Sequence, residues 1–173
     1  MNITGGKFKG RKISAPDERI TRPPLSKIRM GVFNSLYSKF GEFNNLTFLD
    51  VFGGSGIMGL EALSRGFLAV TVIEQNKKSG IILKKNYEQL GLKPEIIIGN
   101  ALNILPKLDK KYTVAYVDPP YQSGIYEDTI KLLKDKAEVI ILEHPSNMEQ
   151  LFKNTTKQKK YGDKTITYIE TST

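Results

Sequence analysis

The stretch FLDVFGGSGIMG, residues 48–59, decides the fold class of this chain. Its first residues are apolar and predict a β-strand over 46–52 that carries Asp50, and its last residues begin a helix over 57–64. Three glycines and a serine lie between them, at 53–56. Glycine lets the backbone approach a ligand closely, and the N-terminus of the following helix favours negative charge. A strand, a glycine turn and a helix in this order predict an α/β fold with a ligand site at the end of the strand.

The rest of the chain continues this alternation. Further strands are predicted over 69–74, 95–98, 113–117 and 138–143, and further helices over 76–90, 101–107 and 124–134. Because each parallel crossover needs a helix, these elements predict a mostly parallel sheet covered on both faces. A short helix near 147–152 precedes two strand-like runs around Gly162 and Asp163, and so tight a turn predicts an antiparallel C-terminal hairpin. We expect a single domain over 1–173.

The N-terminus is strongly basic. The chain has a net charge of +8, and residues 1–30 hold eight basic side chains against two acidic ones. Glycines among apolar residues predict a small β-hairpin, and prolines after it predict a linker, so that 1–24 forms an extension to a body over 25–173. A solvated tail is one interpretation of such charge, and a phosphate-binding arm is the other. The candidate phosphate contacts of the hairpin are Lys7, Lys9, Arg11 and Lys12.

An amphipathic helix is expected after the linker. Apolar residues recur every four positions at Ile28, Val32, Leu36 and Phe40, and Ser26 can act as the N-cap. This helix joins the basic extension to the first strand of the sheet.

Two acidic residues accompany the glycine turn. Asp50 and Glu74 stand at the ends of the first two predicted strands, where a carboxylate can accept hydrogen bonds from ribose hydroxyls. The segment GSGIMG, residues 54–59, also satisfies the dinucleotide-binding pattern, so a nicotinamide-dependent oxidoreductase is a rival. Asp50 favours another ligand, because a carboxylate before the glycines repels a pyrophosphate and attracts the ammonium group of a methionine moiety. We therefore expect S-adenosylmethionine as the cofactor. Its candidate contacts are Asp50, Gly53, Gly54, Ser55, Gly56, Glu74 and, at the adenine ring, Asn100.

The fourth predicted strand leads into the sequence Asp118-Pro119-Pro120-Tyr121. An exocyclic amine of a nucleobase is a poor nucleophile because its lone pair is delocalised into the ring. Hydrogen bonds from the amine to the Asp118 carboxylate and the Pro119 carbonyl would aim that lone pair at a methyl group. Pro120 has no N–H to compete for this carbonyl, and Tyr121 offers a face on which a flipped base can stack. The tetrapeptide predicts methyl transfer to the amino group of a base.

Several classes are excluded or disfavoured by composition. The apolar runs are far shorter than the roughly 20 residues of a membrane-spanning helix, and the N-terminus lacks the apolar stretch of a secretory signal. We therefore expect a cytoplasmic protein without membrane association. With no cysteine and a single histidine, His144, the chain offers few ligands for a metal site, and we expect none.

Three longer segments carry a family resemblance. Together with the tetrapeptide, they resemble the bacterial 16S ribosomal RNA guanine amino-group methyltransferases. The segments are TRPPLSKIRMGVFNSL (21–36), LDVFGGSGIMGLEALSRG (49–66) and the GGKFKGRK hairpin (5–12). The resemblance covers essentially the whole chain, including a terminal hairpin that contains YGD. It implies the Rossmann-like class I methyltransferase fold, with seven strands, and a monomer that acts on 16S rRNA in an assembled or assembling small ribosomal subunit.

The resemblance also implies a reaction and roles for particular residues. The reaction is methyl transfer to the N2 amino group of guanine 966. Arg22, Arg29 and Asn34 fall on the N-terminal signature, where they would order the loop over the active site or contact RNA. Pro24 and Met30 depart from the family pattern, which usually has threonine and glutamate at these positions.

Other functions remain open at this point. Related tetrapeptides serve enzymes that methylate adenine in DNA or RNA and glutamine in proteins. The small size disfavours a sequence-specific DNA enzyme, and the basic N-terminus disfavours a protein substrate. A non-catalytic RNA-binding assembly factor is the remaining alternative.

Overall fold

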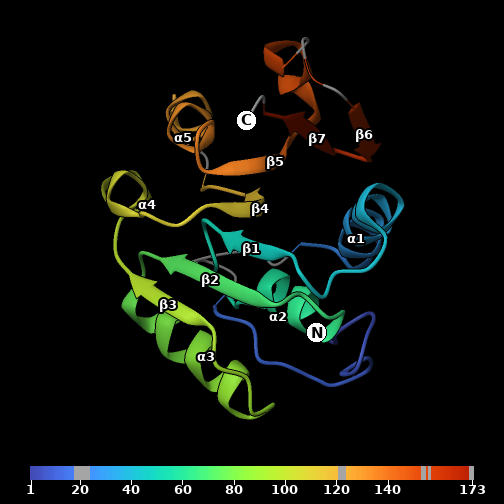
Figure 1. Cartoon of the computed structure of the whole chain (residues 1–173), viewed down its shortest axis with the longest axis vertical. Coiled ribbons are helices and arrows are strands. Elements are labelled where there is room, and N and C mark those ends of the chain that lie inside the picture. The colour runs from blue at the N-terminus through green and yellow to red at the C-terminus, as the bar shows by residue number, and fades with distance from the viewer. Residues whose placement is uncertain (18–23, 121–123, 153–154, 156, 172–173) are drawn as a thin grey trace.

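The computed structural model describes residues 1–17, 24–120, 124–152, 155 and 157–171. Within these residues, seven strands form one sheet in the order β3-β2-β1-β4-β5-β7-β6 (Figure 1). The strands are β1 (Thr47–Asp50), β2 (Ala69–Glu74), β3 (Glu95–Ile98), β4 (Tyr112–Val117), β5 (Ala137–Pro145), β6 (Lys157–Tyr161) and β7 (Lys164–Glu170). Strands β1 to β5 pair in parallel, and β7 is antiparallel to both of its neighbours. The predicted mostly parallel sheet with an antiparallel C-terminal hairpin is confirmed.

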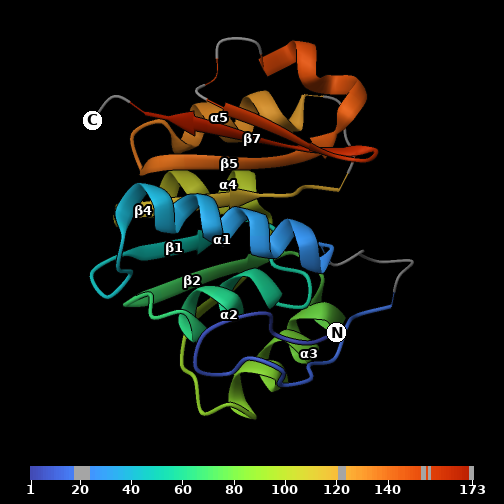
Figure 2. The ribbon, with the colours of Figure 1, turned by 90° about the vertical axis from the view of Figure 1, so that its right-hand side faces the viewer.

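Helices cover both faces of this sheet. They are α1 (Ser26–Phe40), α2 (Ile57–Ser64), α3 (Lys77–Glu88), α4 (Ala101–Ile104) and α5 (Ile125–Leu133), with 3-10 helices η1 (Leu105–Lys107) and η2 (Ser146–Phe152). Figure 2 shows α1 and α2 in front of the strands and α4 and α5 behind them. None of the helices in the described part of the chain combines the length and apolar character needed to cross a membrane.

Two hydrophobic cores follow from the alternation of side chains along each strand. In β4, Val114 and Tyr116 belong to the core under α1, α2 and α3, whereas Ala115 and Val117 belong to the core under α4 and α5. Both sets are buried because a parallel sheet needs cover on both faces. Phe33 of α1 stacks on Phe48 of β1 with ring centroids 5.9 Å apart, which anchors α1 over the middle of the sheet.

The predicted helices over 101–107 and near 147–152 are present, in part as 3-10 helices, whereas the predicted N-cap of α1 was wrong. The helix predicted over 101–107 changes to a 3-10 helix at Leu105, because Pro106 has no N–H with which to continue the α-helical pattern. The short helix near 147–152 is also 3-10 and begins at Ser146. Ser26 is the first residue of α1 instead of its N-cap, a position that Leu25 takes without a side-chain hydrogen bond.

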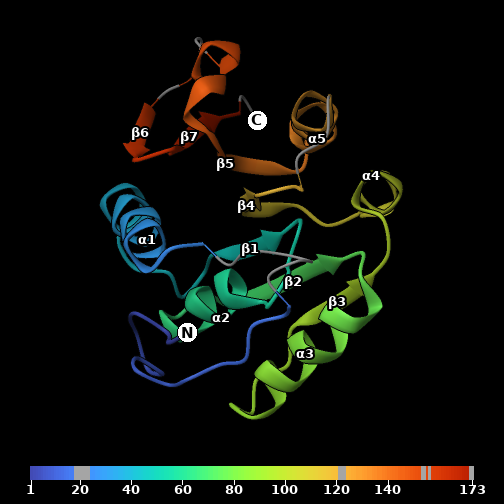
Figure 3. The ribbon, with the colours of Figure 1, turned by 180° about the vertical axis from the view of Figure 1, so that it is seen from behind.

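The predicted N-terminal hairpin is a loop closed by a single antiparallel bridge, between Asn2 and Lys12. The tip of this loop is held against α2: Lys7 donates to the Ser64 carbonyl at 2.7 Å and Phe8 to the Ser64 hydroxyl at 2.9 Å. Gly6 makes this approach possible, since a Cβ at its φ of +77° would lie 1.9 Å from the Ser64 oxygen. The views from opposite sides both place this loop beside α2 (Figures 1 and 3).

A buried carboxylate fastens the same loop to the body. Glu61 of α2 is fully buried and accepts hydrogen bonds from the main chain and hydroxyl of Thr4. Arg65 lies 2.5 Å and Arg29 3.9 Å from its oxygens, and Arg29 also donates to the Asn2 carbonyl at 2.9 Å. This cluster joins the loop, α1 and α2 through charge-assisted hydrogen bonds.

Replacing Glu61 is expected to destabilise the protein strongly. Glu61→Ala leaves two arginines without their buried anion, and breaking a buried pair in this way costs about 3–5 kcal/mol. Urea denaturation measures the loss. The control is Glu95→Gln, which breaks the exposed Lys110–Glu95 pair and should cost less than about 1 kcal/mol. Equal losses for both variants would contradict this role of the cluster.

Candidate active site

Four carboxyl groups gather at the carboxyl edge of the parallel strands. Asp50 ends β1, Glu74 ends β2, Asp118 directly follows β4, and Glu143 lies near the end of β5. Asp50 pairs with Tyr116, and Val117 pairs with Leu142, so that Asp118 and Glu143 come next to each other on neighbouring strands. Parallel pairing therefore brings together residues that are up to 93 positions apart in the sequence.

The glycine turn is held in place by β2 and α3. Gly53 donates to the Ile73 carbonyl at 2.8 Å, and Gly54 donates to Glu74 Oε2 at 2.6 Å. A Cβ on Gly53 would lie 2.3 Å from Val72 Cγ1, so this close approach of turn and strand requires glycine. Gly54 and Gly56 have φ angles of 57° and 83°, a region that other residues rarely adopt.

Two buried side chains of α3 support the turn from behind, and sequence reasoning missed both. Asn86 donates to the Ser55 carbonyl at 2.9 Å and to the Ser14 carbonyl at 2.8 Å. Tyr87 donates to the Gly56 carbonyl at 3.0 Å. They come from the segment KKNYE, whose sequence carries no motif, and only the packing of α3 against α2 gives them this role.

Asp50 is a buried carboxyl group in an acidic environment. Burial and the nearby charge of Glu74 raise its pKa from the ordinary 3.8 to about 8, against the hydrogen bonds that the main chains of Phe52 and Gly59 donate to it. A cation placed here would favour the ionised form. The ammonium group of a methionine moiety fits this requirement, and the glycine turn, whose residues 53–56 are buried, lies beside it.

Glu74 and Asn100 stand at the neighbouring strand ends, as predicted, but part of their hydrogen-bonding capacity is used within the protein. Glu74 accepts from Gly54 and, at 2.9 Å, from the main chain of Asn76. Asn100 caps α4, where its side-chain oxygen accepts from Leu102 at 2.9 Å. Its amide N–H groups are therefore the atoms that could meet an adenine ring. Ser55, which was placed in the same set, is buried, and its hydroxyl accepts from Ile57 at 3.3 Å.

Asp118 and Glu143 form a contact of their own. Their side chains hydrogen-bond to each other, and the Tyr116 hydroxyl donates to Glu143. Burial and the charge of Glu143 raise the pKa of Asp118 well above its ordinary value. Pro119 is buried and Pro120 is exposed. Tyr121 lies outside the described residues.

The basic candidates fall into three groups. Lys7, Lys9, Arg11 and Lys12 are exposed on the N-terminal loop, and Asn34 is exposed on α1. Arg29 is only 3% exposed and is engaged by Asn2 and Glu61, so the prediction that it contacts RNA is not retained; it orders the loop instead. Arg22 lies outside the described residues.

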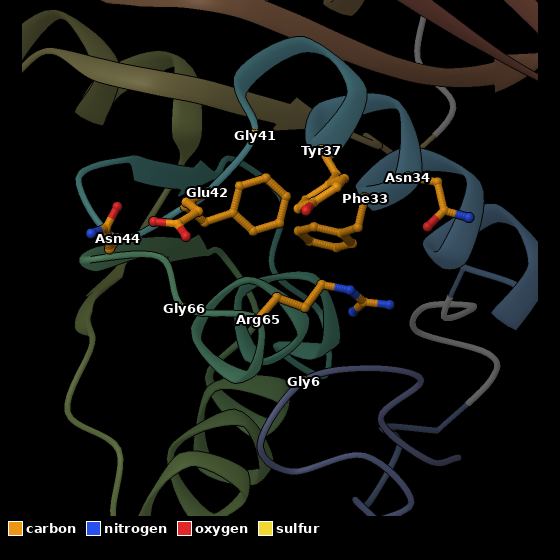
Figure 4. A pocket seen from close by; sticks show the side chains of 10 residues that line it. Gly6, Phe33, Asn34, Tyr37, Gly41, Glu42, Asn44, Arg65 and Gly66 are labelled. Carbon is orange, nitrogen blue, oxygen red and sulfur yellow. The ribbon is translucent and has the colours of Figure 1, made fainter.

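A surface pocket lies at the opposite edge of the sheet (Figure 4). It measures about 430 Å³ and is lined by α1, by the segments that precede β1 and β2, and by the N-terminal loop at Gly6. Phe33, Tyr37 and Arg65 are among its walls, and Asn34 is the one predicted site residue that lines it. None of the acidic candidates contributes to it, so the pocket is separate from the candidate active site.

Within the part of the chain that the structure describes, no group of three or more His, Cys, Asp or Glu side chains is arranged to hold a metal ion.

Three features define a class I methyltransferase fold. They are the strand order with an antiparallel β7 between β5 and β6, the glycine turn after β1 and the Asp-Pro-Pro segment after β4. More particularly, the chain belongs to the family described as "Conserved hypothetical protein 95", whose profile matches residues 1–170.

Relatives and solved structures of known proteins agree with this assignment. The chain is 41% identical over 136 residues to ribosomal RNA small subunit methyltransferase D of Buchnera aphidicola, which covers 78% of this chain and 70% of the relative. It is 35% identical over 136 residues to the protein of the same name in Escherichia coli K12, with 78% and 67% covered. A structure titled as a putative methyltransferase, yhhF, from Escherichia coli superimposes with a TM-score of 0.82 at 26% identity, over 100% of this chain and 99% of that one.

The buried acid at Asp50 should make stability depend on pH. The folded protein keeps its proton up to a pH of about 8, whereas the unfolded chain releases it near 3.8, so the stabilisation is complete below about pH 4 and is lost as the pH rises through 8. Without ligand, Asp50→Asn should therefore gain stability relative to the wild type between about pH 4 and 8, by about 1–4 kcal/mol.

Thermal unfolding of both proteins across this pH range measures the effect. Asp163→Asn, at an exposed position in the turn between β6 and β7, serves as the control and should show no such trend. A constant difference between wild type and Asp50→Asn at every pH would show that Asp50 is not protonated in the folded protein.

Proposed function

We propose that this protein transfers a methyl group from S-adenosylmethionine to the N2 amino group of a guanine in 16S rRNA, at guanine 966 of the small ribosomal subunit. The observation that carries the proposal is the position of Asp118 directly after β4, at the same edge as the glycine turn and Asp50. Membership of the family and the names of the relatives support rRNA as the substrate. A monomer in the cytoplasm, acting on an assembled or assembling subunit, fits this role.

The cofactor would lie along the carboxyl ends of β1, β2 and β3. Asp50 would hold its ammonium group, the Gly53–Gly56 backbone would line the methionine moiety, Glu74 would meet the ribose hydroxyls, and the Asn100 amide would meet the adenine ring. The bound sulfonium supplies an electrophilic methyl group. The cofactor ammonium would favour the ionised form of Asp50, since a neighbouring cation lowers the pKa that burial has raised.

The base would lie beside Asp118. The Asp118 carboxylate and the Pro119 carbonyl accept hydrogen bonds from the exocyclic amine, which holds the nitrogen lone pair toward the methyl group. Tyr121 would stack on the guanine ring. Methyl transfer that relies on such positioning and electrostatics needs neither a covalent intermediate nor a metal.

The exposed bases of the N-terminal loop would contact phosphates. Lys7, Lys9, Arg11 and Lys12 are exposed on a loop that hydrogen bonds hold against α2, and the family resemblance adds Arg22 and Asn34 as further candidate RNA contacts. A fixed array of cations loses less entropy on binding a polyanion than a mobile tail does.

Asp118→Ala should lower the rate of methyl transfer by about 10²–10³-fold while RNA affinity stays nearly unchanged, because the amine loses its acceptor and the phosphate contacts remain. The purified protein is incubated with labelled S-adenosylmethionine and unmethylated small subunits, free 16S rRNA or duplex DNA, and labelled nucleosides are identified by mass spectrometry. Asp109→Ala, which removes an exposed carboxylate, is the control.

Label in N2-methylguanosine that disappears in Asp118→Ala supports the proposal. Label in methyladenine would overturn the guanine substrate and leave the cofactor in place. RNA binding without label in the wild type would favour an assembly factor.

Removing three bases of the loop should weaken RNA binding in a salt-dependent way. With Lys7, Lys9 and Arg11 replaced by alanine, the slope of log affinity against log salt should become shallower by about 2, since each lost phosphate contact accounts for about 0.7–0.9. Fluorescence anisotropy at several salt concentrations measures this slope. The matched control replaces Lys107, Lys131 and Lys134, three exposed lysines on the opposite face, and an equal change there would show that only net charge matters.

A further inference from the structure

Glu143 is a buried acid to which cofactor and base binding assign no role. It lies in β5 and is 3% exposed, and its main-chain carbonyl accepts a hydrogen bond of 3.0 Å from the Tyr126 hydroxyl of α5. The Asp-Pro-Pro-Tyr segment does not include it. Carboxylates are rarely buried without a partner that repays the lost hydration.

The partners of the Glu143 side chain lie toward the candidate active site. The Tyr116 hydroxyl donates to its Oε2, and its side chain hydrogen-bonds to that of Asp118. Lys164, at the start of β7, is the cation whose charge acts on both carboxyl groups, and Asp50 adds a further negative charge beside Asp118. His144, the next residue of β5, lies among the α5-side contacts instead, with its ring 4.8 Å from that of Phe152.

Two carboxyl groups in such contact cannot both be ionised, because like charges at hydrogen-bonding distance in a buried site repel strongly. One proton between them turns the repulsion into a hydrogen bond. The pair then carries a single negative charge and titrates as a unit.

We propose that Glu143 is a positioning residue for methyl transfer, which shares one proton with Asp118 and thereby makes Asp118 the acceptor of the proton that the substrate amine loses. This inference rests on the proposed function, since it assumes an amine as the methyl acceptor. It goes beyond the tetrapeptide, because it adds a residue from β5 to the chemistry of β4.

The step balances in atoms and charge. As the amine lone pair forms the N–C bond, the C–S bond breaks and its electron pair stays on sulfur, which becomes a neutral thioether. The nitrogen is then cationic and gives one N–H proton to Asp118. The pair, with one proton and one negative charge before the step, ends with two protons and no charge, and solvent regenerates it after product release.

The electrostatics agree with this geometry. The charge of Glu143 raises the pKa of Asp118, while the hydrogen bonds from Tyr116 and Asp118 hold down the pKa of Glu143 against its burial. The pKa of each carboxyl group is raised, which agrees with one proton held between them. Substrate N–H donors favour ionised Asp118, so binding of the amine would shift the proton toward Glu143.

The test is Glu143→Gln, which keeps the size of the side chain and removes its charge. In the active form the shared proton lies toward Glu143 and Asp118 is ionised, so kcat rises with pH through the first pKa of the pair. Glutamine cannot carry the shared proton, so ionised Asp118 loses this donor and the acid limb of the kcat profile should move to higher pH by about 1 unit. The plateau of kcat should fall by about tenfold or more, because the donor that positions the Asp118 carboxylate toward the amine is weakened. The KM for S-adenosylmethionine should not change.

Three companion variants separate this role from a structural one. Tyr116→Phe keeps both carboxyl groups but removes the donor to Glu143, and should shift the acid limb in the same direction by less. Glu143→Asp keeps the charge and should return the acid limb toward that of the wild type. Glu138→Gln removes an exposed carboxylate from the same strand and should change neither quantity. A lower melting temperature for Glu143→Gln with an unmoved acid limb would overturn the proposal.

A measurement without substrate keeps this test independent of the proposed function. Carboxyl ¹³C NMR of the free protein should show the last titration step of Asp118 at higher pH in the wild type than in Glu143→Gln. Identical titrations would overturn the shared proton whatever the substrate is. Different titrations in a protein that methylates no RNA would leave the pair standing and overturn the proposed function alone.

Discussion

The repulsion among carboxyl groups at one edge of a parallel sheet is the constraint on which the structure of this site depends. Parallel strands all end at the same edge, so acidic residues at the ends of β1, β2, β4 and β5 are brought together whatever their separation in the sequence. The repulsion on each carboxyl group is relieved in a different way. Glu74 accepts backbone N–H groups, Asp118 and Glu143 share a hydrogen bond, and Asp50 keeps a raised pKa that a cationic ligand would lower.

This arrangement ties ligand binding to the protein interior. The glycine turn lies between Glu74, which accepts from Gly54, and α3, which donates from Asn86 and Tyr87 to its carbonyl oxygens. Asn86 also bonds Ser14 near the end of the N-terminal loop. The cofactor turn and the N-terminal segment are therefore connected through one buried amide.

The basic side chains in and around the N-terminal loop fall into two groups, one that fixes the loop and one that faces solvent. Arg29 and Arg65 are used inside, around Glu61, to fix the loop on α1 and α2, and their charges are compensated there. The lysines of the loop point to solvent, and their charges remain for a polyanion. The two arginines around Glu61 hold the loop because a planar guanidinium can bond several acceptors at once, whereas exposed lysines serve as point charges.

The sequence alone determined the order of strands and helices, the glycine turn, and the positions of Asp50, Glu74 and Asp118 at strand ends, because hydrophobic periodicity and glycine placement are local properties. It did not reveal that Arg29 is buried, that the N-terminal hairpin reduces to one bridge, or that Pro106 changes a helix to 3-10. The contacts of Asn86, Tyr116 and Glu143 were also beyond it. These features were decided by tertiary structure, since they depend on which distant segments compete for the same hydrogen bonds and which charges the sheet places side by side.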